Sequence, residues 1–119
     1  MGRPLKINKV IEDNGQWLVV DVSTPRCPAA LLKIDRVNWD WLVDNGFHVA
    51  ASIHYKTVYA HVVIARRNVY LHRLILGLTA GEEADHINRD GLDNRRSNLR
   101  VCSRLQNAHN QGAQWATSS

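Results

Sequence analysis

The stretch that decides the fold runs from Asp85 to Asn110 and reads DHINRDGLDNRRSNLRVCSRLQNAHN. A short strand is expected over 83–87, and the polar, glycine-containing segment 88–94 is typical of a loop rich in turns. A second strand is expected over 99–101. The two strands should lie side by side, which places the first two residues of the stretch next to the start of the second strand.

A helix is predicted directly after the second strand. Ser103 is followed three residues later by Gln106, and this spacing is a capping box, which predicts a helix over 104–110. Asn107 then falls in the second turn, one turn after Arg104, so both side chains should lie on the same side of the helix. The whole stretch is therefore expected to form a strand, an ordered loop, a strand and a capped helix.

Four side chains in this stretch carry candidate chemistry. Asp85 and His86 put a carboxylate beside an imidazole, and Asn98 and Asn107 add two amides. A histidine suits a general base because its pKa lies near neutrality. Carboxylate and amide oxygens are ligands that a hard divalent cation prefers. Together these groups are the parts needed to hold one metal ion and one general base against a phosphodiester.

This set of residues, together with the segment LHRLI over 71–75, resembles the ββα-metal core of the HNH nucleases. More narrowly, it is similar to the phage and bacterial HNH proteins that are related to intron-encoded homing nickases. The resemblance is strong over 69–110 and holds only in outline over 34–65. A pair of Asp and His alone is a weak signal, whereas the complete spaced set is a specific one.

The resemblance implies a role for each matching residue. His86 would be the general base, and Asn98 would be the amide that braces the loop carrying it. Asp85 and Asn107 would be the ligands of one divalent metal ion per site, Mg²⁺ or Mn²⁺. The family's three-letter name ends in a histidine, and Asn107 stands at that position here. Because related homing nickases share this asparagine, the resemblance implies a hard metal rather than inactivity.

The function implied by the resemblance is a metal-dependent DNA endonuclease that leaves 5′-phosphate and 3′-hydroxyl ends. Two alternatives stay open: a DNA-binding protein that keeps the fold without cleaving, and a phage packaging accessory that cuts only within a larger complex. The sequence also leaves three questions open. They are the target sequence, whether one strand or both are cut, and whether the protein is a monomer or a homodimer.

The remainder of the chain is predicted to be rich in strands. Its expected elements are a strand over 17–22, a loop over 23–28, a strand over 30–34, a short helix capped by Asp35, a hairpin of 47–55 and 58–65, a turn over 66–68, and a helix over 69–78 ended by Gly77 or Gly81. In the short helix, Val37, Trp41 and Leu42 are expected on one side.

The predicted fold class is α+β, with a small antiparallel N-terminal sheet packed against a C-terminal ββα-metal core. The 119 residues are near the commonest size of a single domain, so one domain is expected over 1–119. Within it we expect a β-rich part over 1–68, a helix and the catalytic core over 69–111, and a flexible tail over 112–119.

Several further residues have two interpretations. Asn94 competes with Asn98 for the bracing role, but it precedes the second strand and is interpreted as a turn cap. His72 is interpreted as a surface polar residue on a packed helix. Trp17, Trp39 and Trp41 are expected in the core.

The charge balance permits a polyanionic partner. Lysine and arginine number 15 against 11 acidic residues, and arginine dominates the cationic side. Its planar guanidinium suits bidentate phosphate contacts, so double-stranded DNA is the expected partner. The arginines gathered around the candidate site are interpreted as DNA contacts: Arg66, Arg67, Arg73, Arg95, Arg96, Arg100 and Arg104.

The cellular location follows from what the sequence lacks. The first six residues, MGRPLK, have no apolar run of a signal peptide, and no stretch reaches the length of a membrane span. Cys27 and Cys102 are too far apart and too few for a zinc ribbon. The protein is expected in the cytoplasm of a bacterial or phage-infected cell, with no membrane partner.

Overall fold

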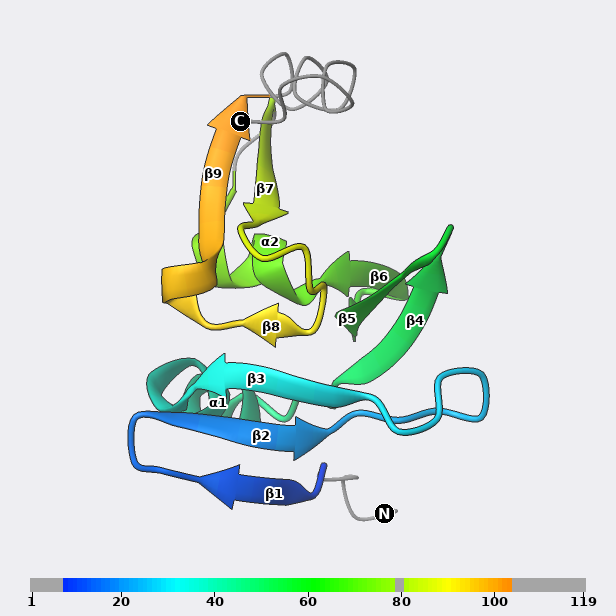
Figure 1. The fold of residues 1–119 in the computed structure, drawn as a ribbon, viewed down its shortest axis with the longest axis vertical. Helices are drawn as coiled ribbons and strands as arrows, with labels where there is room; N and C mark the ends of the chain where they lie inside the picture. The colour runs from blue at the N-terminus through cyan, green and yellow to red at the C-terminus, as the bar shows by residue number, and fades with distance from the viewer. Residues whose placement is uncertain (1–7, 79–80, 104–119) are drawn as a thin grey trace.

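The computed structural model describes residues 8–78 and 81–103, and in these ranges the protein is α+β and mostly strands (Figure 1). The elements in chain order are β1 (Val10–Asp13), β2 (Trp17–Asp21), β3 (Leu31–Asp35), α1 (Arg36–Asp44), β4 (Ala50–His54), β5 (Thr57–Ile64), β6 (Arg67–Tyr70), α2 (Leu71–Leu76), β7 (Glu82–His86), β8 (Asp93–Asn94), a 3₁₀ turn η1 (Arg96–Asn98) and β9 (Leu99–Ser103). No helix in the described ranges is long and apolar enough to cross a membrane.

The N-terminal sheet has four strands in the order β1, β2, β3, β8. The predicted strands at β2 and β3 are confirmed, but the prediction of an antiparallel sheet is wrong at one edge, because β8 pairs with β3 in parallel. Residues 93 and 94, which were assigned to a loop, form this edge strand. β1 was not predicted, because all four of its residues are exposed and give no apolar pattern.

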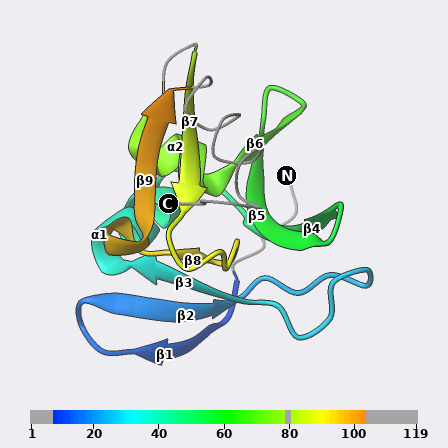
Figure 2. The same ribbon diagram turned by 45° about the horizontal axis from the view of Figure 1, so that its top comes forward.

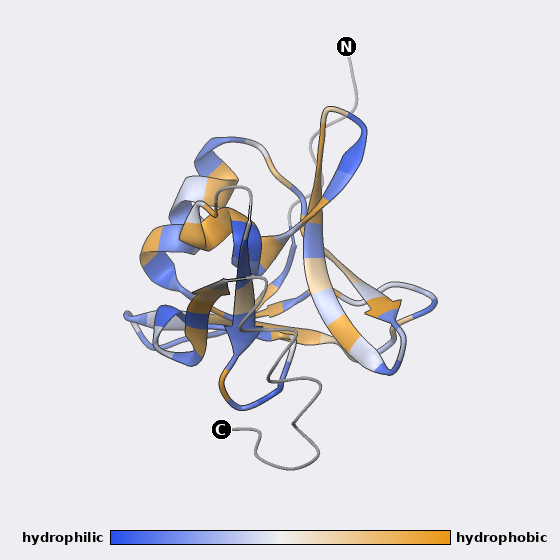
Figure 3. Cartoon of the chain, turned by 90° about the horizontal axis from the view of Figure 1, so that it is seen from above, coloured by the Kyte–Doolittle hydropathy of each residue, from blue (hydrophilic) through white to orange (hydrophobic). Residues whose placement is uncertain are grey.

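The second sheet is formed by β4, β5 and β6, which are joined by tight turns. The predicted hairpin is confirmed, with its turn at Tyr55 and Lys56. Residues of β5 alternate between the core and the other face, although Val62, Val63 and Ile64 are hydrophobic in succession and Val63 is exposed. Figure 3 shows the hydropathy of each residue along the chain. Ala51, Ala60 and Val62 are buried in the core, together with residues of β2, β3 and α1.

Both helices differ in detail from the prediction. α1 is present, but Trp39 and Leu42 are its buried residues, whereas Val37 is 73% exposed and Trp41 is 49% exposed. Trp39 and Leu42 are three residues apart and therefore share one face, and the core selects that face. α2 begins only at Leu71, since the residues before it continue β6, and it ends at Gly77, which has a left-handed conformation with φ 60°.

The third sheet is the antiparallel pair β7 and β9, which stands beside α2 at the end of the molecule opposite β1 (Figures 1 and 2). The two strands predicted at this place are confirmed. The loop between them descends to the N-terminal sheet, where it contributes β8. The helix predicted over 104–110 and the tail over 112–119 lie outside the described residues.

Candidate active site

Asp85 and His86 lie at the end of β7 on opposite faces of the β7–β9 ladder. His86 pairs with Leu99 and is 5% exposed, while Asp85 pairs with Arg100 at the surface. Successive residues of a strand point to opposite faces, which explains this separation. Arg100 Nη2 donates to Asp85 Oδ2 over 2.6 Å. The carboxylate and the imidazole therefore act from two sides of one strand.

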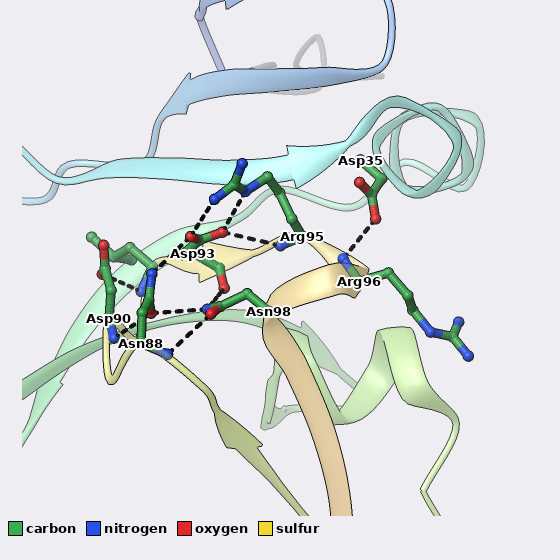
Figure 4. A network of polar contacts seen from close by, with 8 residues as sticks. Asp35, Asn88, Asp90, Asp93, Arg95, Arg96 and Asn98 are labelled. Atoms are coloured by element: carbon green, nitrogen blue, oxygen red, sulfur yellow. Dashed lines mark hydrogen bonds and ion pairs between the residues drawn. The ribbon is translucent and has the colours of Figure 1, made fainter.

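Asn98 closes the loop that follows His86. Its side-chain oxygen accepts a hydrogen bond from the backbone N–H of Asn88 at 3.0 Å. Its amide nitrogen donates to Asn88 Oδ1 at 2.9 Å and to the carbonyl of Asp93 at 2.8 Å (Figure 4). The backbone adds a bond from the Ile87 N–H to the Asn98 carbonyl at 2.8 Å. The buried amide of Asn98 therefore joins both ends of the loop.

A buried ion pair fixes the far side of the same loop. Arg95 Nε and Nη2 each donate to one carboxylate oxygen of Asp93 at 2.8 Å, and Asn88 Nδ2 donates to Asp93 Oδ2 at 3.0 Å (Figure 4). Burial opposes the charged form of Asp93, but the hydrogen bonds from Arg95 and Asn88 outweigh it and lower the pKa of the carboxyl. The guanidinium of Arg95 also lies over the ring of Trp17, 4.8 Å from its centroid.

Asn94 faces His86 rather than acting only as a turn cap. Its Oδ1 lies 3.0 Å from His86 Nε2, and its Nδ2 donates to the Gly91 carbonyl at 3.4 Å. Because a side-chain carbonyl oxygen can only accept, this contact needs a proton on Nε2, and the tautomer that it favours carries its lone pair on Nδ1. The turn-cap interpretation accounted for the bond to Gly91 and missed the bond to the imidazole, for which the sequence spacing gives no signal.

The prediction of a surface position for His72 is wrong. His72 is 7% exposed and forms an aromatic cluster with Tyr59, Tyr70 and His86. Burial, and then the neighbouring His86 and Arg73, lower the pKa of His72 to about 4. The ring is therefore neutral at pH 7. The sequence pattern does not predict this burial, because the His72 ring packs against Tyr59 and Tyr70 of the β4–β6 sheet.

The loop also touches that sheet directly at Gly91. A Cβ at this position would lie 2.2 Å from the carbonyl oxygen of Val58 and 2.9 Å from Tyr59 Cδ1. Only a residue without a side chain permits this approach of loop to strand, so Gly91 sets the distance between the His86 loop and β5.

The arginines predicted to contact DNA fall into separate groups. Arg73 Nη1 donates to the Glu82 carbonyl at 3.1 Å, and Arg95 is held by Asp93 and Trp17, so both have structural contacts.

The backbone N–H of Arg96 donates to Asp35 Oδ2 at 2.7 Å, while its guanidinium points away (Figure 4). Asp35, predicted to cap α1, makes this bond and no side-chain cap bond. Arg66 and Arg67 are exposed at the turn between β5 and β6, and Arg104 lies outside the described residues.

A divalent metal fits the chemistry of this site, though only one of its two predicted ligands is in the described residues. Asp85 offers partly exposed carboxylate oxygens, and a carboxylate can accept at both of them while Arg100 binds one. In the ranges 8–78 and 81–103, no group of three or more His, Cys, Asp and Glu side chains could hold a metal ion. An ion at Asp85 would therefore need further oxygens from Asn107, from DNA or from water.

Comparison with known proteins gives one match. Residues 69–109, about a third of the chain, match the family model described as HNH endonuclease. This segment contains α2, β7, the braced loop and β9, and the match supports a relationship to the HNH endonucleases. No curated protein and no solved structure matches the chain.

Proposed function

We propose that the protein is a metal-dependent DNA endonuclease and that His86 is its general base. The observation that carries this proposal is the buried His86, which is bonded through Nε2 to Asn94 in a loop braced by Asn98, within the segment that matches HNH endonucleases. An imidazole whose Nε2–H is held by Asn94 would accept a proton at Nδ1, which is the arrangement a general base needs.

The reaction follows from the tautomer that Asn94 selects. His86 Nδ1 accepts a proton from a water molecule, whose oxygen attacks the phosphorus of the scissile phosphodiester. The bond from phosphorus to the 3′ oxygen breaks, the leaving oxygen takes a proton from solvent water, and the products are a 5′-phosphate and a 3′-hydroxyl. Asn94 stabilises the imidazolium that forms, because Nε2 keeps its hydrogen bond to Oδ1 throughout.

Asp85 and Asn107 are the proposed ligands of one Mg²⁺ or Mn²⁺. When bound, such an ion stabilises negative charge on the phosphate and on the leaving oxygen. Asp85 and His86 are neighbours at the end of β7, so the proposed ligand and the proposed base lie at the same end of this strand.

In this proposal DNA is held by arginines with exposed side chains, which are Arg66, Arg67, Arg96 and Arg100. Arg100 also forms an ion pair with Asp85 at the surface, so a phosphate would compete with that carboxylate. Arg104 remains a candidate by its place in the sequence, whereas Arg73 and Arg95 are left out because they are only partly exposed and their guanidinium groups are engaged. We further propose a monomeric nickase of the homing type that acts in the cytoplasm of a bacterial or phage-infected cell. This finer assignment rests on sequence resemblance alone.

The test is incubation of the full chain with supercoiled plasmid and Mg²⁺ or Mn²⁺, with EDTA as the control. Nicked circles support the nickase, and linear product supports an endonuclease that cuts both strands. A protein that shifts the plasmid in a gel but leaves it supercoiled with both metals is a non-cleaving DNA binder, or an accessory that needs its complex. That result would contradict the proposal.

A further inference from the structure

The imidazole of His86 is packed against a second histidine, His72. The two ring centroids lie 4.7 Å apart and the ring planes cross at 66°, so the rings meet edge to face. Tyr59 packs against His86 as well, with centroids 5.9 Å apart. His86 therefore contacts two other rings in addition to the hydrogen bond from its Nε2 to Asn94.

His72 is itself held in place by the two tyrosines. The rings of Tyr70 and His72 stack at 5.5 Å with planes 19° apart, and Tyr59 lies 5.8 Å from His72 and 5.3 Å from Tyr70. These rings come from β5, β6 and α2, whereas His86 comes from β7. The cluster therefore joins the β4–β6 sheet to the strand that carries the proposed base.

A polar link does not explain why a histidine occupies this place. The Nδ1 atom of His72 is buried and has no hydrogen-bond partner among the described residues. Its depressed pKa of about 4 keeps the ring uncharged at neutral pH. His72 therefore meets His86 as an uncharged ring in an edge-to-face contact.

Ring packing matters here because one hydrogen bond does not fix an imidazole. The χ2 torsion of histidine is broad and roughly two-fold, so the ring can turn over and exchange the positions of nitrogen and carbon. The bond to Asn94 holds one atom of the His86 ring, and the plane of that ring must be set by packing.

We propose that His72 is a positioning residue for His86. The ring of His72, supported by Tyr59 and Tyr70, holds the His86 imidazole with Nε2 on Asn94 and Nδ1 available as the base. The catalytic part of this inference rests on the proposed function. Its structural part, the orientation of the His86 ring, does not.

The test compares three variants of the full chain. His72→Leu removes the ring, and His72→Phe keeps a ring but removes both nitrogens. His61→Leu is the matched control, because His61 also has a buried Nδ1 without a described partner and makes no described ring contact with His86. We expect folded His72→Leu to lose roughly 10- to 100-fold in kcat with KM for DNA unchanged, while His72→Phe and His61→Leu stay close to the wild type.

A second readout separates positioning from activity. In the metal-free protein, the ¹⁵N chemical shifts of the His86 ring should report one Nε2-protonated tautomer in the wild type and in His72→Phe, and a mixture in His72→Leu. The proposal is overturned if folded His72→Leu keeps both kcat and the single tautomer, or if folded His72→Phe loses either. If His72→Leu does not fold, the proposal is judged on His72→Phe alone, and loss of kcat or of the single tautomer in folded His72→Phe overturns it. If the wild type cuts no DNA, the proposed function fails, and the ¹⁵N signals still decide the positioning role.

Discussion

Replacing Asp93 by asparagine should destabilise the protein through the loop that carries His86. The carboxylate of Asp93 is fully buried, and both of its oxygens accept bonds from Arg95. Asparagine keeps the shape of the side chain but removes the charge and one of the two acceptors. It therefore leaves a guanidinium over Trp17 without its counter-ion.

The size of the effect follows from the burial of the two partners. Removing one partner of a fully buried ion pair costs about 3–5 kcal/mol, because the other charge is left without compensation. The side chain of Arg95 is 29% exposed, so water can hydrate part of the guanidinium after the substitution. We therefore expect Asp93→Asn to lower the free energy of unfolding by about 2–3 kcal/mol, which is less than for a fully buried pair.

Urea denaturation of Asp93→Asn, of Asp90→Asn and of the wild type is the assay. Asp90 is an exposed carboxylate of the same loop whose Oδ1 accepts from the Leu92 N–H, a bond that asparagine can keep. Its substitution should change the free energy of unfolding by less than about 0.5 kcal/mol. Because the pKa of Asp93 is lowered from 3.8, its contribution should be complete above that pH and be lost as pH falls through the lower folded value. Equal stability of the two variants at pH 7 would refute the structural role of the pair.

Three further predictions concern the loop and the site. Gly91→Ala should lower stability by about 1–3 kcal/mol in the same urea assay, since its Cβ would collide with the Val58 carbonyl; an unchanged midpoint would contradict the close approach. Asn94→Ala should lower kcat of DNA cleavage by about 10- to 100-fold in steady-state assays with KM unchanged, and wild-type kcat would show that Asn94 does not orient the base. EDTA should stop cleavage, excess Mg²⁺ should restore it, and the thermal melt should not move; a melt that collapses on chelation would indicate a structural metal instead.

The parts of the site that follow from local sequence were predictable. The strands on either side of the loop are marked by flanking turn residues, and their pairing places Asp85 and His86 beside β9 as expected. The bracing role of Asn98 was implied by the resemblance to the HNH nucleases, and its amide does bond to Asn88 across the loop. The strand pairing, in contrast, follows from local patterns that span few residues.

The parts that depend on distant segments were not predictable. Two residues of a polar loop become β8 because they meet β3, sixty residues earlier in the chain, and a two-residue strand has no periodicity to detect. His72 is buried beside the rings of Tyr59 and Tyr70, and Tyr59 comes from β5, thirteen residues earlier in the chain. The face of α1 is likewise chosen by the core, which takes Trp39 and leaves Trp41 half exposed.

The central claim is that His86 provides general-base catalysis of DNA hydrolysis, and single-turnover cleavage of an end-labelled duplex by the wild type and by His86→Ala tests it most directly. We expect the wild type to cut with Mg²⁺ or Mn²⁺ and to leave 5′-phosphate ends. His86→Ala should bind the duplex with the same affinity and cut it roughly 10²- to 10⁴-fold more slowly. Cleavage by folded His86→Ala at the wild-type rate would contradict the claim.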